Sequence, residues 1–254
     1  LTAVSSGLSA FVGYAGLGIC LDALEAQTLP RDRFEIVVAD NNSPVGLDAV
    51  EAVNRGRAKI VLVTDKGAEP ARNGAVAASR GEVLAFIDSD CVAEPQWLAE
   101  GLSGLDRFDL VGGRVTVLVG DEQNMTPSEA FERVFAFDFK TYIEKKGFTG
   151  AGNMFCRREL FDRVGGFRVG LSEDVEWSRR AVSMGARLGY APGAACGHPA
   201  RVTWDQLITK WRRLNEETFG LMEGQPGRRG RWLARNLLMP LSAIAHTPKV
   251  LRSR

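Results

Sequence analysis

Helix-forming and strand-forming patterns alternate along the first hundred residues of this 254-residue chain. Leu17, Leu21 and Leu24 recur at helical spacing, and the β-rich run Phe34–Asp40 stops at the turn cluster Asn41–Pro44. The alternation then repeats, with helices expected near 45–55, near 70–80 and from Pro95, and strands over Lys59–Thr64 and Glu82–Asp88. Successive βα units predict a parallel sheet that helices cover on both faces, with ligands bound beyond the carboxyl ends of its strands.

The pattern changes after residue 105. We expect a strand over Asp109–Val119, a Phe-rich helix near 127–145 and a Gly-containing segment over 148–156. A helix near 173–185, a short strand near 186–191 and a basic helix near 204–220 follow. This half of the chain therefore indicates a mixed sheet rather than a doubly wound one.

Composition excludes several classes of protein. With 45% hydrophobic and 25% charged residues the chain is globular, and its apolar runs are far shorter than the ~20 residues of a membrane-spanning helix. Its four cysteines lie far apart without a CxxC spacing, which favours core thiols over a zinc or disulfide framework. No basic and apolar leader pattern opens the sequence, so we expect a cytoplasmic protein.

The sharpest local feature is Asp88-Ser89-Asp90, directly after the apolar run Val83–Ile87. Two carboxylates two residues apart at a strand end can face the same ligand, and oxygen ligands of this kind suit Mg²⁺ or Mn²⁺ held together with a diphosphate. A solvated turn, or a cap for the helix that follows, is the alternative interpretation.

The segment Gly67–Asp90, which includes Arg72 and Asn73, resembles the donor-binding region of family 2 glycosyltransferases. The resemblance covers roughly residues 17–220 and extends to five further segments: Cys20–Thr28, Phe34–Ser43, Gly150–Met154, Arg157–Phe167 and Ser172–Arg180. It implies an α/β GT-A fold, the Rossmann-like fold of nucleotide-diphospho-sugar transferases. We expect a single domain over 1–223 with a mixed central sheet, its nucleotide-binding half over 1–105 and its acceptor half over 106–223, and a basic helical extension over 224–254.

The same resemblance implies a nucleotide-sugar donor site. Its donor-binding residues would be Asp40, Arg72, Asn73, Asp88 and Ser89, with Asp40 accepting the imide N–H of a uracil or thymine base. Asp90 would bind Mn²⁺ or Mg²⁺ directly, with His198 as a further ligand, and the cation would neutralise the leaving diphosphate. The alternatives are a turn-initiating Asp40, a helix-surface pair at Arg72 and Asn73, and a structural His198.

The resemblance also implies which residues bind the acceptor and the sugar, in the segments around residues 152 and 174. Asp174 would be the general base that takes the proton of the acceptor hydroxyl, and Glu173 would position a sugar. Gly152, Asn153 and Met154 would line the sugar pocket, and Arg180 would form a buried ion pair. Capping of the helix by Asp174 and a β-bulge around Gly152 are the alternatives. Lys210 and Arg213 would contact the diphosphate, unless they belong to an exposed basic helix face.

These residues together predict a metal-dependent inverting glycosyltransferase that uses a nucleotide sugar, most simply a UDP-sugar, in polysaccharide or glycolipid assembly. Two alternatives stay open: a non-catalytic nucleotide-sugar-binding protein of the same fold, and an NAD-dependent Rossmann enzyme built on Gly16-Leu17-Gly18 with Asp40. The stretch Ser5–Gly16 lacks the apolar strand and the Pro-aromatic-Asn element with which the family opens, which puts the first strand in question.

The carboxyl-terminal residues are strongly basic. Residues 201–254 hold 11 Lys/Arg against 4 Asp/Glu, a net charge of +7, whereas residues 1–200 carry −6. Within 228–254, arginines alternate with Trp232 and leucines at near-helical spacing. We expect this tail either to lie on an anionic membrane surface, at the cytoplasmic face of the plasma membrane, or to pack on the domain with solvated arginines. The acceptor would then be a carbohydrate or a lipid-linked saccharide, and no nucleic acid is expected.

Overall fold

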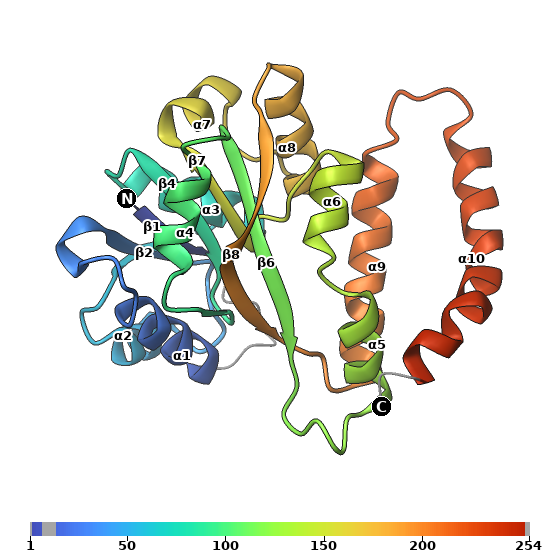
Figure 1. Cartoon of the computed structure of the whole chain (residues 1–254), viewed down its shortest axis with the longest axis horizontal. Coiled ribbons are helices and arrows are strands. Elements are labelled where there is room, and N and C mark those ends of the chain that lie inside the picture. The colour runs from blue at the N-terminus through green and yellow to red at the C-terminus, as the bar shows by residue number, and fades with distance from the viewer. Residues whose placement is uncertain (1, 7–13, 252–254) are drawn as a thin grey trace. The chain divides into compact units, whose positions relative to one another are not determined.

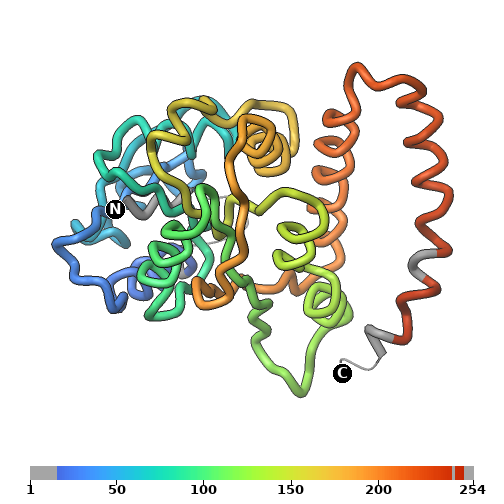
Figure 2. Tube along the Cα trace, turned by 45° about the horizontal axis from the view of Figure 1, so that its top comes forward, coloured from blue at the N-terminus to red at the C-terminus, as the bar shows by residue number. Residues whose placement is uncertain are grey.

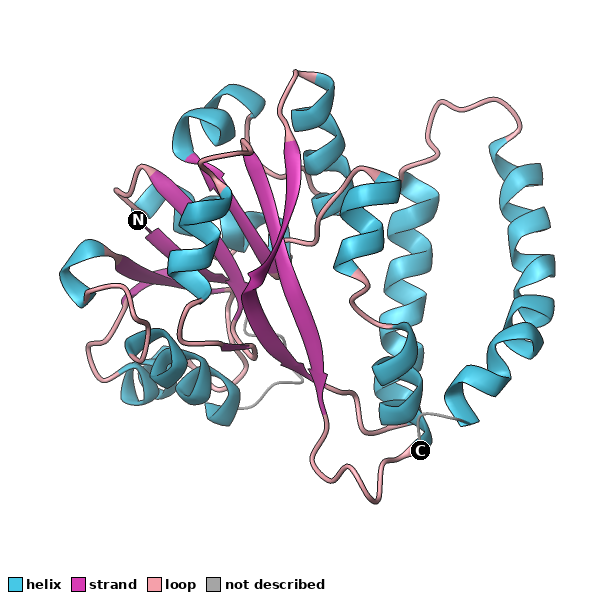
Figure 3. Cartoon of the chain, in the orientation of Figure 1, coloured by secondary structure: helices cyan, strands magenta, loops and turns pink. Residues whose placement is uncertain are grey.

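The computed structural model describes residues 2–6 and 14–251, and its centre is one eight-stranded mixed sheet (Figures 1 and 3). Its strands in spatial order are β3 (Lys59–Leu62), β2 (Glu35–Asp40), β1 (Thr2–Ser6), β4 (Val83–Asp88), β7 (Asn153–Arg157), β6 (Leu110–Leu118), β8 (Leu188–Pro199) and β5 (Val92–Ala93). The first four pair in parallel, whereas β7 is antiparallel to both β4 and β6, and β5 is antiparallel to β8. The predicted mixed sheet is therefore confirmed.

The first strand is present although its sequence departs from the family pattern. β1 lies between β2 and β4, with Ser6 opposite Ala39 on one side and Asp88 on the other. Residues 7–13, which hold most of the unusual stretch, lie outside the described residues. Gly16 and Gly18 stand inside α1 (Tyr14–Glu25) rather than in a turn before it, so the fingerprint needed by the NAD alternative is absent from this part of the described chain.

Helices cover both faces of the sheet, as the βα alternation predicts (Figure 3). On one face, α3 (Ala68–Ala78), α7 (Arg158–Val164) and α8 (Glu173–Ser183) bury a core that includes Phe86 and Trp177. α1 and α4 (Trp97–Gly104) bury apolar residues at the other face, where the Trp97 and Phe155 rings lie 4.8 Å apart. α2 (Leu47–Asn54), which packs on α1, and the short 3-10 helix Arg31–Arg33 complete this part of the chain.

Two elements differ from their sequence predictions. The helix expected near 127–145 is two helices, α5 (Pro127–Phe135) and α6 (Phe139–Lys146), because Phe137 takes a left-handed backbone conformation with φ of 59°. The strand expected near 186–191 continues as β8 to Pro199, which carries Cys196 and His198 into the sheet. The helix predicted near 204–220 is confirmed as α9 (Trp204–Gly220).

The contacts divide the chain into two compact units. Unit 1 comprises residues 1–116, 138–169 and 173–198, and unit 2 comprises 117–137, 170–172 and 199–254. Unit 2 therefore contains α5, α9 and α10 (Arg228–Leu251), the last two running antiparallel on either side of a loop (Figure 2). This division does not coincide with the boundaries at residues 105 and 223, which stay sequence predictions.

A buried carboxylate organises unit 2. The Glu132 side chain is 1% exposed and accepts hydrogen bonds from Lys210 Nζ at 2.6 Å and from Arg201 Nη1 at 2.9 Å. It also accepts the backbone N–H of Arg201 at 2.8 Å. Although burial opposes its charge, Lys210 and Arg201 hold the pKa of Glu132 below its usual range. Glu132 thus joins α5 to α9 and to the segment that precedes α9.

The substitution Glu132→Gln should lower the free energy of unfolding at pH 7 by about 3 kcal/mol, because Lys210 and Arg201 lose their counter-charge. A lowered folded-state pKa gives stability that is present above the unfolded-state value, about 4.3 for glutamate, and is lost as the pH falls through the folded value. Urea unfolding at pH 7, 5 and 4 should therefore show a difference between wild type and variant that narrows toward low pH. The exposed Glu216→Gln is the control, and a pH-independent difference would contradict this assignment.

Candidate active site

Four potential metal ligands meet at the end of β4. One ligand atom from each of Asp88, Asp90, Cys91 and His198 lies within 4.8 Å of the others, a group called the cation cluster below. His198 Nε2 lies 3.6 Å from Asp90 Oδ2, and their side chains are 9% and 13% exposed. The structure thus brings together Asp90 and His198, the two residues predicted to bind a metal. Cys91 is a free, buried thiol, as the sequence predicts, but the sequence analysis did not place it beside the metal-binding candidates.

Strand pairing explains why residues 90 and 198 meet. β5 follows the Asp88–Cys91 turn directly and pairs antiparallel with β8, with Val92 opposite Gly197 and Ala93 opposite Cys196. Continued by one residue, this register brings Cys91 next to His198. The Cys91 N–H donates to the Asp88 carbonyl at 3.0 Å and closes the turn. The adjacency of Cys91 to Asp90 is the sequence signal for its place in the cluster.

Gly152 lies against the Asp88 carboxylate. A Cβ atom at Gly152 would lie 2.5 Å from Asp88 Oδ2, so a side chain at this position would displace the carboxylate. Of the three residues predicted to line a sugar pocket, Gly152 is therefore the one that lies beside the cation cluster. Its lack of a side chain leaves room for the Asp88 carboxylate.

The two residues that follow, also predicted to line the sugar pocket, have buried side chains, and their pocket role stays a prediction. Asn153 is wholly buried, accepts Trp97 Nε1–H at 2.9 Å and donates to the carbonyls of Arg114 and Ala194 at 3.0 and 2.9 Å. Met154 is also wholly buried and belongs to the core under α3 and α7. Strand alternation in β7 directs these two side chains to opposite faces of the sheet, and both are surrounded by protein.

Arg72 connects the cation cluster to the start of α8. Its Nη2 donates to Asp88 Oδ1 at 3.0 Å and its Nη1 to Glu173 Oε1 at 2.6 Å, while its guanidinium lies over the Phe167 ring. The Arg72 side chain is only 7% exposed, so it is not part of a surface pair. Burial opposes its charge, yet Glu173 and Asp88 raise the pKa of Arg72 above its usual range. This bridge was not foreseen from the sequence.

Asp174 directly follows Glu173, to which Arg72 donates a hydrogen bond. Its Oδ1 accepts the backbone N–H of Val175 at 2.7 Å, and its side chain is half-buried. The negative charge of Asp174 also helps to raise the pKa of Arg72, which places it within electrostatic range of the guanidinium. Glu173, Asp174 and Glu176 all lie in the first turn of α8, where carboxylates are stabilised by the helix dipole.

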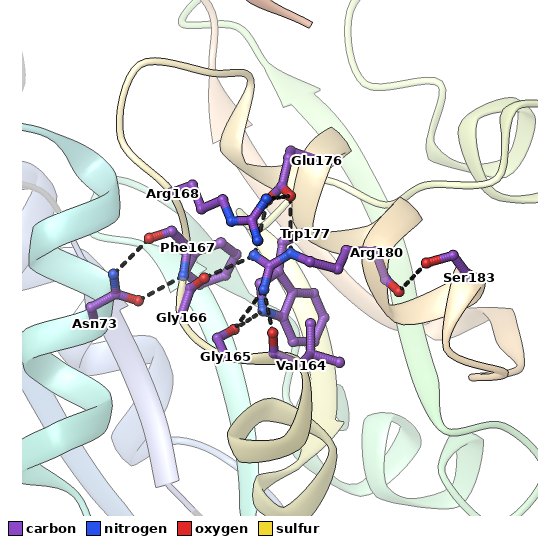
Figure 4. Close-up of polar contacts among 10 residues, drawn as sticks. All are labelled: Asn73, Val164, Gly165, Gly166, Phe167, Arg168, Glu176, Trp177, Arg180 and Ser183. Carbon is purple, nitrogen blue, oxygen red and sulfur yellow. Dashed lines mark hydrogen bonds and ion pairs between the residues drawn. The ribbon is translucent and has the colours of Figure 1, made fainter.

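Asn73 forms hydrogen bonds with the turn Gly165–Phe167, which precedes α8 (Figure 4). Its Nδ2 donates to the Phe167 carbonyl at 2.8 Å, and its Oδ1 accepts the Phe167 N–H at 2.9 Å. From the other side, Arg180 donates to both oxygens of Glu176 at 2.9 Å and to the carbonyls of Val164 and Gly166. The ion pair predicted for Arg180 is confirmed. The donor contact predicted for Asn73 stays a prediction, because the amide is already bonded to Phe167.

Two other predicted donor residues lie in the protein interior. Asp40 is 1% exposed, and its Oδ1 accepts the backbone N–H of Ser43 at 3.0 Å, the contact expected of a turn-initiating Asp. Ser89 is 3% exposed, between the two carboxylates of the cluster. Recognition of a base by Asp40 therefore remains a prediction.

The residues predicted to contact the diphosphate lie in unit 2. Lys210 donates to Glu132 at 2.6 Å, and burial lowers the pKa of Lys210 below its usual range despite that carboxylate. Arg213 is 57% exposed and lies 3.7 Å from Glu217 on the same helix. The exposed-face alternative therefore describes Arg213 but not Lys210, and the diphosphate role of both stays a prediction.

Comparison with curated proteins finds relatives among glycosyltransferases. The chain is 31% identical to the glycosyltransferase AglE of Haloferax volcanii over 205 residues, which cover 78% of this chain and 66% of AglE. It is 29% identical to the pre-mycofactocin glycosyltransferase of Mycobacterium tuberculosis over 159 residues, 57% of this chain and 33% of that protein. The chain thus spans two thirds or less of these relatives.

Solved structures of glycosyltransferases share the fold. The mannosyltransferase PcManGT of Pyrobaculum calidifontis, in complex with GDP-Man and Mn²⁺, matches with a TM-score of 0.59 and 21% identity over 99% of this chain and 72% of that one. TarS of S. aureus, in complex with UDP-GlcNAc, matches with a TM-score of 0.59 and 18% identity over 79% of this chain and 58% of that one. These likenesses confirm the GT-A fold. The sequence model of "Glycosyl transferase family 2" matches residues 9–176, about two thirds of the sequence, and the chain belongs to that family.

Proposed function

We propose that this chain transfers a sugar from a nucleotide sugar to a hydroxyl acceptor, with inversion at the anomeric carbon and with a divalent cation bound at the donor site. The observation that carries this proposal is the Arg72 bridge, which joins Asp88 of the cation cluster to Glu173, the neighbour of the candidate base Asp174. The names of the relatives and the nucleotide sugars bound by the structural neighbours support it.

The donor atoms of the cation cluster fit a divalent metal. Asp90 and His198 would hold Mn²⁺ or Mg²⁺, with Asp88 beside them, and the room left by Gly152 keeps the Asp88 carboxylate within the cluster. When bound, such a cation supplies Lewis-acid neutralisation of a leaving diphosphate. PcManGT was solved with Mn²⁺, which supports the same use here.

Asp174 is the proposed general base. Single displacement requires one group to take the proton from the acceptor oxygen as that oxygen attacks the anomeric carbon and the bond to the nucleoside diphosphate breaks. Arg72 donates to the adjacent Glu173. The turn Gly165–Phe167 before α8 accepts hydrogen bonds from Asn73 of α3 and from Arg180 of α8. Asp174 therefore projects from a helix start that is restrained on two sides, which is the positioning that proton transfer requires.

For the donor and the acceptor we propose chemical classes rather than single compounds. A UDP-sugar is proposed because the family resemblance assigns base recognition to Asp40, and a carboxylate can accept the imide N–H of uracil. The acceptor is proposed to be a carbohydrate or a lipid-linked saccharide in polysaccharide or glycolipid assembly. A non-catalytic nucleotide-sugar-binding protein is the alternative function, and it differs in showing no turnover with any donor.

We also propose that α10 binds a membrane surface. No helix in the described part of the chain has the length and apolar content needed to cross a bilayer. α10 packs on its own unit through the Phe135–His246 and Phe219–Trp232 ring pairs, 5.7 and 5.3 Å apart. Its residues Leu233, Leu237, Leu241 and Ile244 form an exposed apolar stripe near a cluster of arginines. This combination suits an anionic leaflet, such as the cytoplasmic face of the plasma membrane.

The substitution Asp174→Asn should reduce kcat about 100-fold to 10,000-fold, because the amide cannot accept the acceptor proton. Release of nucleoside diphosphate from UDP-, GDP- and dTDP-sugars in the presence of Mn²⁺ measures this effect. Thermal stabilisation by the nucleoside diphosphate should persist in the variant. The exposed Asp162→Asn is the matched control, and full activity in Asp174→Asn would rule out the base assignment.

The Arg72 bridge should appear as coupling in a double-mutant cycle. Arg72→Gln should cost about 3 kcal/mol of stability, since it leaves two carboxylates without their partner, and Glu173→Gln should cost less when Arg72 is already replaced. Urea unfolding of the two single variants and the double variant measures the coupling. The exposed pair Arg187 and Asp109, 3.1 Å apart, is the control and should show little coupling. Equal coupling in both pairs would contradict a special role for the bridge.

Membrane binding should depend on the apolar stripe of α10. The full chain with Leu237→Gln and Leu241→Gln should partition at least about tenfold more weakly onto vesicles of anionic phospholipid, because two apolar side chains are lost from the interface. Flotation of vesicles measures the partition. Val169→Gln, which changes an exposed apolar side chain in unit 1, is the control. Unchanged partition of the α10 variant would exclude the membrane surface.

A further inference from the structure

Cys91 is the member of the cation cluster that the proposed chemistry does not use. Its Sγ lies within 4.8 Å of ligand atoms of Asp88, Asp90 and His198, and the residue is 1% exposed. The tight turn from Asp88 and the β5–β8 register hold it there, so its place results from the backbone rather than from a flexible side chain. The sulfur atom therefore lies in one group with two carboxylates and an imidazole, beside the Cys196 thiol with which it shares a hydrogen bond.

The ligand set separates this site from an all-oxygen one. Mg²⁺ is bound mainly by carboxylates, phosphates and water, whereas a combination of thiolate, imidazole and carboxylate is typical of Zn²⁺ and of its analogues Co²⁺ and Cd²⁺. With four protein ligands in reach, a thiophilic cation also has less need of phosphate oxygens to complete its coordination. The chemistry thus favours binding to the protein alone.

We propose that Cys91 is a direct sulfur ligand of the cation cluster, and that the cluster binds a thiophilic divalent cation such as Co²⁺ or Zn²⁺ without a nucleotide. The inference rests on the metal site of the proposed function and deepens it by adding a sulfur ligand, with which the site also accepts thiophilic cations besides Mn²⁺ or Mg²⁺. On binding, the Cys91 thiol gives its proton to water and its sulfur forms the bond to the cation. No electron is transferred, so no oxidant or reductant is needed.

The first experiment is a titration of the full chain, freed of metal by a chelator, with Co²⁺ in the absence of nucleotide. A cobalt–thiolate bond produces a charge-transfer band in the near ultraviolet, and we expect this band to saturate at one equivalent. Cys91→Ser should abolish the band and weaken Co²⁺ binding at least about tenfold. Cys156→Ala, which alters another wholly buried thiol in the core, is the matched control and should leave the band unchanged.

Circular dichroism and Mn²⁺ binding check that Cys91→Ser is folded. We expect the substitution to weaken Mn²⁺ binding less than Co²⁺ binding, because Mn²⁺ depends less on a sulfur ligand. If the variant does not fold, Cys91→Ala, which removes the sulfur without burying a hydroxyl, provides the second test in the same Co²⁺ titration.

The Co²⁺ titration can contradict the role of Cys91 and still leave the proposed function intact. Co²⁺ binding without a thiolate band, or an unchanged band in Cys91→Ser, would overturn the role of Cys91. Absence of Co²⁺ binding would also overturn it. The proposed function is tested separately, by Mn²⁺-dependent release of nucleoside diphosphate and its loss in Asp90→Ala, so the two failures are distinguishable.

Discussion

One guanidinium lies between two carboxylates that come from different layers of the fold. Arg72, on α3, binds Asp88 at the end of β4 and Glu173 at the start of α8. A buried arginine needs such partners, because a lone charge in the protein interior is strongly unfavourable. The same contacts fix the two ends of the candidate site, since Asp88 belongs to the cation cluster and Glu173 precedes the proposed base.

A second constraint is the short strand after the Asp88–Cys91 turn. β5 has two residues, yet its pairing with β8 brings His198 to the acidic turn from more than a hundred residues away. The cluster therefore depends on the late strand β8 continuing to Pro199. A cluster made by sheet pairing holds its side chains more rigidly than a loop can.

Much of the fold could be predicted because its signals are local. The apolar run before Asp88 marks a buried strand, the spacing of Leu17, Leu21 and Leu24 marks a helix, and α9 begins and ends close to the predicted limits. The break at Phe137 was missed, because a left-handed residue without glycine has little sequence signal. The contacts of Asn153 could not be predicted either, since burial and three tertiary hydrogen bonds decide where that amide lies.

The sequence by itself determined the βα order, the acidic turn at the end of β4 and the family, because hydrophobic period, turn residues and motif spacing are properties of neighbouring residues. Only the tertiary structure decided which side chains meet. Cys91 and His198 come together through strand pairing, and Arg72 reaches Glu173 across 101 positions of the chain. The physical reason is that such contacts depend on the register of the sheet and on the packing of helices upon it, which no local pattern encodes.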